Sequence, residues 1–129
     1  MNIQQIKETC LYIHDLDRTE SFYQGVLDLP VIGKKPDRHI FFRAGRSVLL
    51  CFLPQATRQE TELPPHYAEG PAHLAFEVTS EEYQQWKTKI EAAGVAILHE
   101  QIWRDKYASF YFHDPDGHLL EIVEEGMWG

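Results

Sequence analysis

Three residues of this chain carry side chains that bind divalent metals, and they occupy related places in the sequence. Glu8 and His73 each stand at the head of an apolar segment, "ETCLYIH" and "HLAFEV". Glu121 lies within "HLLEI", an acid among leucines and isoleucine. An isolated carboxylate on a buried strand face is costly or becomes protonated, so it needs a metal or a hydrogen-bond partner. Two carboxylates and an imidazole form a ligand set that leaves positions open for a substrate.

Each of these residues also has a purely structural explanation. Glu8 alone is equally a solvated residue before a strand, and a lone His73 is more often held half-buried by hydrogen bonds. Cys51, which we align with Glu121 in the other half of the chain, is more often a small buried hydrophobe than a ligand. Glu121 is the hardest to explain without a partner, because strand alternation places it on the same face as Leu119 and Val123.

The elements that must position these residues occur twice, in the same order. The first half contains an apolar strand, an amphipathic helix, a short strand and a hairpin; the segments are 8–14, about 17–27, "PVIGKK" and "HIFFRAGRSVLLCFL". The second half repeats this order, with a Thr79–Glu82 capping box before its helix and Gly94 after it. Its strands are 73–78, "VAILHE" and the hairpin "SFYFHDPDGHLLEIVEE", with the turn at 114–117.

This repetition predicts an α+β fold of two βαβββ modules that form a cupped, half-barrel mixed sheet. A sheet must bury one face, and the two inner faces of such a fold would enclose a cavity. We expect one domain over residues 1–129, with module one at about 6–54, a Pro-rich and polar linker at about 55–70, and module two at about 71–126.

Several further side chains are candidates to line this cavity. The candidates are Cys51, His66, Tyr107, Phe42 and Trp103, within a wider aromatic set that includes Phe41, Phe110, Tyr111, Phe112 and Trp128. Core packing explains most of these aromatics equally well, since only one face of each strand can meet a ligand. His66 is also readily explained as a loop histidine. Arg43 and Arg46 are surface arginines by default, although either has the charge to bind an anion.

Composition restricts the classes of partner. The 129 residues include 12 basic and 20 acidic side chains, for a net charge of −8, which argues against nucleic acid because phosphate binding needs a basic surface. No apolar run approaches the roughly 20 residues that span a membrane. Two cysteines without a paired motif or a signal peptide indicate a reduced cytoplasm. The expected partner is a small-molecule substrate.

Three segments of the chain resemble the vicinal oxygen chelate superfamily, which contains glyoxalases, bleomycin resistance proteins and extradiol dioxygenases. "LYIHDLDRTESFYQGVLDLPV" looks like the first strand and helix of that family, and "GPAHLAFEV" like the opening strand of its second module. "SFYFHDPDGHLLEIVEE" looks like its closing hairpin and is the most specific of the three. The C-terminal "EEGMWG" is similar to the end of short glyoxalase-like proteins.

The resemblance implies that Glu8, His73 and Glu121 bind a divalent metal and that Glu8 or Glu121 serves as the catalytic base. A fourth ligand, a glutamate of glyoxalase I, would fall at or beside Cys51, where this sequence has no carboxylate. Extradiol dioxygenases and fosfomycin thiol transferases generally have histidine at the position of Glu8. The more anionic set here favours Mn, Mg or Ca, with Zn, Ni or Fe as further candidates.

The implied function is that of a glyoxalase-like, metal-dependent lyase, isomerase or transferase that acts on a small oxygen-chelating substrate by Lewis-acid catalysis. One alternative is a metal-free protein that sequesters a small molecule, as bleomycin resistance proteins do. Another is an extradiol-type dioxygenase, which the loss of the usual histidine disfavours. Open sheet edges, together with the resemblance, lead us to expect a homodimer.

Overall fold

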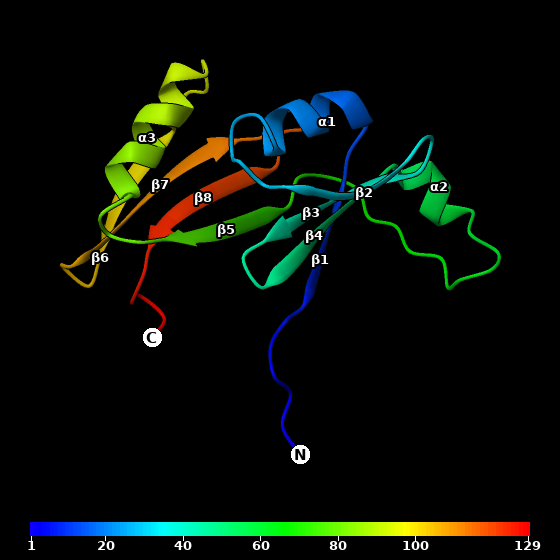
Figure 1. Ribbon diagram of the computed structural model, residues 1–129, viewed down its shortest axis with the longest axis horizontal. Coiled ribbons are helices and arrows are strands. Elements are labelled where there is room, and N and C mark those ends of the chain that lie inside the picture. Colours follow the sequence, from blue (N-terminus) through cyan, green and yellow to red (C-terminus); the bar gives the residue numbers. More distant parts are fainter. The chain divides into compact units, whose positions relative to one another are not determined.

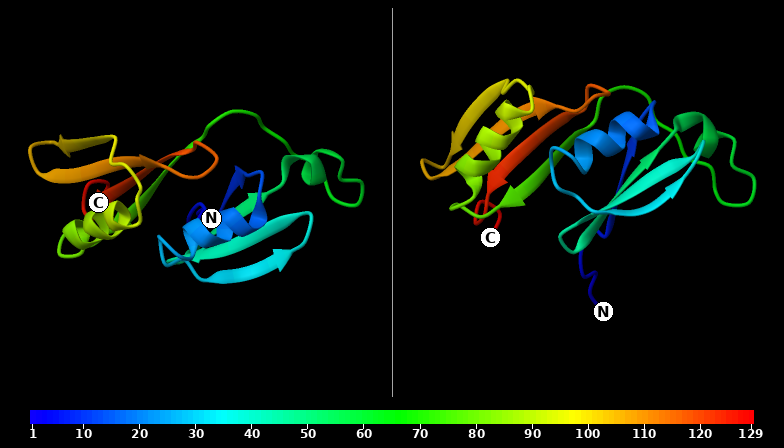
Figure 2. Two further views of the ribbon diagram at one scale, coloured as in Figure 1. Left: turned by 90° about the horizontal axis from the view of Figure 1, so that it is seen from above. Right: turned by 45° about the horizontal axis from the view of Figure 1, so that its top comes forward.

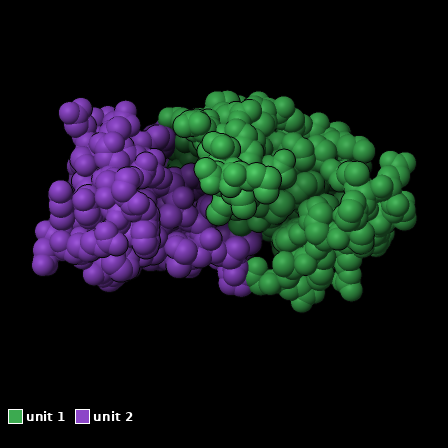
Figure 3. Space-filling model, turned by 90° about the horizontal axis from the view of Figure 1, so that it is seen from below, with its two compact units in different colours: residues 1–70 green, residues 71–129 purple.

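The computed structural model describes all of residues 1–129, and the chain forms two compact units. The first unit is Met1–Gly70 and the second is Pro71–Gly129 (Figure 3). Each unit contains a four-stranded mixed sheet with a helix across one face (Figures 1 and 2). The predicted α+β class and the repeated βαβββ order are therefore confirmed.

The sheet of the first unit has the strand order β1-β4-β3-β2, with β1 parallel to β4 and the other pairs antiparallel. Its elements are β1 (Glu8–Tyr12), α1 (Leu16–Tyr23), β2 (Val31–Lys35), β3 (His39–Ala44), β4 (Ser47–Phe52) and a short α2 (Pro54–Arg58). The second unit has the equivalent order β5-β8-β7-β6, with β5 parallel to β8. Its elements are β5 (His73–Val78), α3 (Tyr83–Ala92), β6 (His99–Trp103), β7 (Tyr107–His113) and β8 (Leu119–Glu124).

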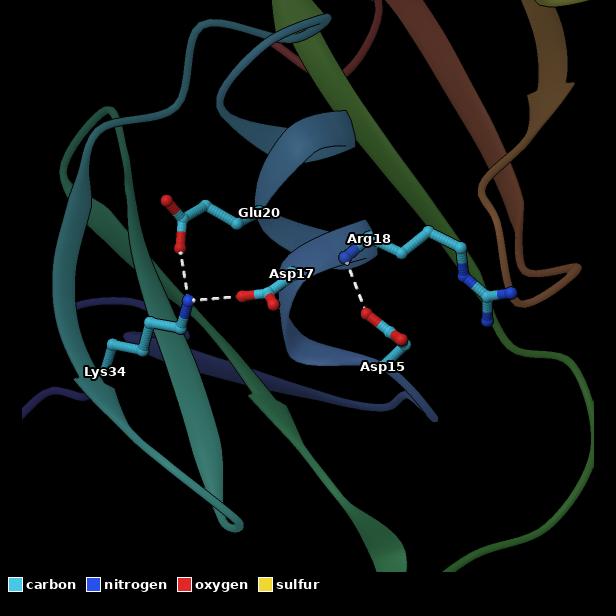
Figure 4. Close-up of polar contacts among 5 residues, drawn as sticks. All are labelled: Asp15, Asp17, Arg18, Glu20 and Lys34. Atoms are coloured by element: carbon cyan, nitrogen blue, oxygen red, sulfur yellow. Dashed lines mark hydrogen bonds and ion pairs between the residues drawn. The ribbon is translucent and has the colours of Figure 1, made fainter.

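Helix α1 begins at a polar cap and is tied to its sheet by charge. The Asp15 carboxylate accepts a hydrogen bond from the backbone N–H of Arg18 at 2.8 Å, which satisfies an N–H of the first turn. Lys34 on β2 reaches both Asp17 and Glu20 on α1, with Nζ 2.8 Å from a carboxylate oxygen of each (Figure 4). These contacts link the surface of the helix to strand β2.

The core of the first unit lies between α1 and the sheet. The ring of Tyr23 on α1 lies 5.5 Å from that of Phe42 on β3, and both side chains are fully buried. Cys51 on β4 is also fully buried, on the strand face that carries Leu49. Phe42 and Cys51 were predicted to line a cavity, and this is wrong, because strand alternation turns both of them toward the helix.

The core of the second unit is built in the same way. Tyr83 of α3 packs edge-on against Phe110 of β7, and its hydroxyl donates to Glu100 on β6 at 2.9 Å. Gly94, predicted to follow the helix, has a positive φ of 83° there. Of the predicted Thr79–Glu82 capping box, the structure shows the bond from the Glu82 N–H to Thr79 Oγ1 at 3.2 Å, but the N-cap is Glu82 and the helix begins at Tyr83.

The closing hairpin of the second unit follows its prediction closely. Asp114 Oδ1 accepts the backbone N–H groups of Asp116 and His118 at 3.0 and 2.8 Å, and Gly117 takes a positive φ of 83°. His118 is 4 % exposed, and its Nδ1 accepts the N–H of Ala72 at 2.9 Å. The turn therefore sets the hairpin and also fixes the start of the neighbouring β5.

Several predicted elements are wrong in their boundaries or were missed, and the first strand ends at Tyr12 rather than at residue 14. The helix predicted to reach residue 27 ends at Tyr23 and continues as a turn, because Gly25, a poor helix former, follows and Asp28 has a φ of 57°. The strand predicted to begin at Val95 begins at His99, since Val95 still bonds back to Ile90 at the end of α3. Helix α2 lies where only linker was predicted, with Pro54 in its first turn.

No helix of the chain has both the length and the apolar character needed to cross a membrane.

Candidate metal centre and ligand pocket

His73 and Glu121 meet on the helix-free face of the second sheet. Parallel pairing of β5 and β8 sets His73 opposite Leu119 and Ala75 opposite Glu121, so both side chains point to the same face. His73 Nε2 lies 3.3 Å from Glu121 Oε1. The Glu121 side chain is only 8 % exposed, whereas that of His73 is 50 % exposed. The acid is thus buried beside an imidazole that remains accessible from solvent.

The imidazole of His73 is oriented by the backbone. Its Nδ1 lies 2.9 Å from the carbonyl oxygen of Leu119, and a carbonyl can only accept, so Nδ1 carries the proton. This leaves Nε2 facing the carboxylate of Glu121. Two lone pairs at this distance repel, so the contact is favourable only with a proton or a cation between them. A backbone carbonyl on one ring nitrogen is also the usual way in which a metal-binding histidine is held.

A pocket of about 500 Å³ opens beside this pair. Its polar members come from four strands or their ends, and its remaining walls are apolar. The lining residues are His73, Ala75, Trp103, Arg104, Tyr111, Glu121, Val123, Met127 and Trp128. This volume suits a small organic molecule, and a mainly apolar wall with few polar groups is typical of ligand sites.

Tyr111 supplies a hydroxyl group to the pocket from the position directly opposite Glu121 in the sheet. It pairs with Glu121 across β7 and β8, and its ring stacks beside His73 with centroids 6.0 Å apart. Burial raises the pKa of the Tyr111 phenol, and the charge of Glu121 raises it further. Tyr111 is therefore a protonated hydroxyl that can donate a hydrogen bond in the pocket.

Glu8 occupies in the first unit the register position that His73 occupies in the second. It pairs with Val48 as His73 pairs with Leu119, and it is exposed on the face of β1 turned away from α1. No group of three or more His, Cys, Asp or Glu side chains forms a metal site in the structure. Two of the three predicted ligands, His73 and Glu121, lie together within the second unit.

The register also corrects the predicted equivalence of Cys51 and Glu121. Cys10 pairs with Leu50 in the first unit as Ala75 pairs with Glu121 in the second, so Leu50 is the counterpart of Glu121. Cys51 matches the core residue Ile122 instead. The alignment made from sequence was one residue out of register, which moves every side chain to the opposite face of the strand.

Of the other three residues predicted to line a cavity, one lines the pocket of the second unit and two do not. Trp103 lines the pocket, and its Nε1 donates to Ser109 Oγ at 2.9 Å. Tyr107 is absent from the lining and lies against Gly126. His66 lies on the helix-free face of the first sheet, where its Nδ1 is 2.6 Å from the hydroxyl of Tyr12.

Of the wider aromatic set, Tyr111 and Trp128 line the pocket, whereas Phe110 and Phe112 are fully buried. Sequence reasoning missed Met127, which is 8 % exposed and lines the pocket. A lone methionine next to the chain end carries no periodic pattern that would have indicated burial.

Comparison with known proteins assigns most of the chain to one family. The family model described as Glyoxalase/Bleomycin resistance protein/Dioxygenase superfamily matches residues 5–122. A solved structure described as lactoylglutathione lyase from Agrobacterium tumefaciens is 36% identical, with a TM-score of 0.93 over 99% of this chain and 98% of that one.

Two curated relatives are transferases. Metallothiol transferase FosB of Staphylococcus epidermidis is 30% identical over 127 residues, which cover 95% of this chain and 82% of that protein. Glutathione transferase FosA of Serratia marcescens is 29% identical over 120 residues, which cover 93% of this chain and 80% of that protein.

Proposed function

Because this chain belongs to the glyoxalase/bleomycin resistance protein/dioxygenase superfamily, we propose that it is a metal-dependent enzyme of the lyase or transferase type. Its substrate is a small oxygenated molecule that binds in the pocket of the second unit. The observation that carries this proposal is the orientation of His73, whose Nε2 faces the buried carboxylate of Glu121.

The donor set suits a divalent metal. An imidazole nitrogen and a carboxylate oxygen are ligands for Zn, Mn, Ni or Fe, and additional oxygen ligands extend the range toward Mg. Glu8 is the proposed third ligand, because it stands in its unit where His73 stands in the other. When bound, a divalent metal acts as a Lewis acid that stabilises negative charge developing on a substrate oxygen.

The side chains of the chain itself have separate proposed roles. Glu121 or Glu8 accepts a proton from the substrate, since these are the two carboxylates of the proposed site. The Tyr111 hydroxyl, kept protonated by its raised pKa, donates a hydrogen bond to the bound substrate. The apolar wall formed by residues such as Trp103, Val123 and Met127 excludes water from the reacting atoms.

The relatives support two classes of reaction, and neither class identifies the substrate of this chain. Lyase chemistry is the first candidate, because the lactoylglutathione lyase structure is 36% identical with a TM-score of 0.93. Thiol transfer is the second, because two curated relatives are a metallothiol and a glutathione transferase. A cytoplasmic homodimer completes the proposal; the two unpaired cysteines support the compartment, and open sheet edges with the family resemblance support the dimer.

Metal analysis of protein purified without chelator tests this proposal. We expect one divalent metal per chain in the wild type, and its loss in His73→Ala, Glu121→Ala and Glu8→Ala. Matched controls are His99→Ala and Glu77→Gln, which remove the same side-chain types from the same sheet outside the pocket. Full metal content in His73→Ala and Glu121→Ala, or a wild type that takes up no metal under any loading condition, would overturn the proposal.

A further inference from the structure

Arg104 lies at the rim of the pocket in a backbone conformation that arginine rarely adopts. It occupies the turn between β6 and β7, which the N–H of Lys106 closes onto the carbonyl of Trp103 at 3.0 Å. Arg104 and Asp105 have φ values of 53° and 56°, so two consecutive residues are left-handed. Asn-Gly is the usual choice for such a turn. A turn that departs from local preference at the rim of a pocket is a candidate functional position.

The guanidinium of Arg104 is held on one side only. Nη1 donates to the backbone carbonyl of Met127 at 2.9 Å, and the group lies over the ring of Trp128, 5.7 Å from its centroid. These two partners are neutral, and no carboxylate of the chain forms an ion pair with Arg104. Because a guanidinium has five N–H donors in a planar fork, the group retains donors for an anion in the pocket.

The equivalent turn of the first unit has an arginine at a different position. Arg38 lies between β2 and β3, the counterparts of β6 and β7, and it too lies over a ring, 5.4 Å from the centroid of Phe52. Its guanidinium is also within 3.4 Å of Glu60 Oε1. The register matches Arg104 with Pro36 and Arg38 with Lys106, so only the second unit has an arginine at the position of Arg104, and no carboxylate pairs with it.

The sheet register separates Arg104 from the His73–Glu121 pair. Tyr111 lies opposite Glu121, and Tyr107 lies opposite Trp103, the residue before Arg104. Four residues of strand β7 therefore separate the two places, or about 13 Å at the usual rise of a strand. A ligand that extends along β7 from the His73–Glu121 pair to the Arg104 turn is elongated, with an apolar middle along the wall that includes Val123 and Met127.

We propose that Arg104 is a specificity-determining residue that binds the anionic group of an elongated amphipathic ligand. The anion is a carboxylate, sulfonate or phosphonate at the end of the ligand remote from His73 and Glu121. Only the assignment of the other end, at that pair, rests on the proposed function. In a chain with a net charge of −8, this local cation is what allows an anionic ligand to bind.

Calorimetric titration of chelator-treated protein tests this inference without any metal. The probes are 5-phenylpentanoate and its neutral analogue 5-phenylpentan-1-ol, which differ only in the terminal group. We expect the wild type to bind the carboxylate at least about tenfold more tightly than the alcohol, and Arg104→Gln to bind both equally. Arg104→Lys should keep part of the preference, because it keeps the charge and loses the planar fork.

Two further variants test whether the preference depends on the charge of Arg104 itself rather than on the loss of any arginine or on the shape of the pocket. Arg46→Gln, which removes an exposed arginine from a hairpin turn of the first unit, should leave the preference unchanged. Trp128→Ala should weaken binding of both probes and preserve the ratio between them. Thermal melts and the metal content of Arg104→Gln should match the wild type, which shows that the fold and the pair are intact.

The inference is overturned if Arg104→Gln binds 5-phenylpentanoate as tightly as the wild type, or if neither probe binds saturably to the wild type. Its failure is distinguishable from failure of the proposed function. If the wild type binds metal but does not prefer the carboxylate probe to the alcohol, only this inference is refuted. An intact Arg104-dependent preference in a protein that binds no metal refutes only the proposed function.

Discussion

His73 presents Nε2 to the buried carboxylate of Glu121 at 3.3 Å, while its Nδ1 is held by the Leu119 carbonyl. Both contacts follow from the pairing of β5 with β8, which places the two residues on one face and the carbonyl beside the ring. The geometry costs stability, since a carboxylate that is 8 % exposed has lost most of its water. We attribute that cost to function.

Replacing this acid by leucine should stabilise the metal-free protein. Leu50 occupies the equivalent register position in the first unit, so the sheet accommodates leucine there. We expect Glu121→Leu to raise the free energy of unfolding of chelator-treated protein by about 1 kcal/mol or more, because a buried polar pair often contributes less than apolar packing. Denaturant unfolding measures this difference. The same variant should bind no metal, and a lower stability than wild type in chelator would contradict the prediction.

Tyr83 and Lys87 of α3 both contact Glu100 of β6, and these contacts should make the stability of the protein fall in acid. Hydrogen bonds from Lys87 and Tyr83 lower the pKa of Glu100 below its usual value. A lowered folded-state pKa stabilises the protein above the unfolded-state pKa, and this contribution disappears as pH falls through the folded-state pKa. The melting temperature of Glu100→Gln should therefore lie below wild type at neutral pH and converge with it in acid. The exposed Glu81→Gln should show no such convergence.

The two cysteines should differ in their access to reagents. Cys51 is fully buried in the core of the first unit, whereas Cys10 is exposed, and neither forms a disulfide. A thiol-specific reagent should therefore label one site per native chain and two per unfolded chain, and peptide mapping should locate the native label on Cys10. Rapid labelling of Cys51 in the native protein would contradict its burial between the sheet and α1. It would instead support the prediction from sequence that Cys51 lines a cavity.

The repeated order of elements could be predicted from sequence because local signals mark each one. The Asp114–Gly117 turn, the Thr79 hydrogen bond that precedes α3 and the β5 strand all follow from residue types within a few positions. The position of Glu121 was predictable for the same reason, since an acid within an apolar strand is conspicuous. These features depend on local chemistry rather than on the contacts of distant segments.

The errors arose where pairing between strands decides the outcome. Placing Cys51 opposite Glu121 required the register of two separate parallel pairs, and no local signal reports a shift of one residue. The apolar segment 95–98 has strand-forming residues, but it is needed to return the chain from α3 to the sheet. The sequence around Arg104 does not report its contacts with Met127 and Trp128, which depend on how the C-terminal segment returns to the β6–β7 turn.

The measurement that most directly tests the central claim is imidazole nitrogen NMR of ¹⁵N-histidine-labelled protein, titrated with Zn²⁺ after chelator treatment. We predict that neutral His73 carries its proton on Nδ1, and that its Nε2 resonance moves at one equivalent of zinc while the resonances of His99 stay in place. His73→Ala identifies the signal. A His73 that keeps a proton on Nε2 and is unaffected by stoichiometric zinc would contradict the claim that this histidine and Glu121 bind a metal.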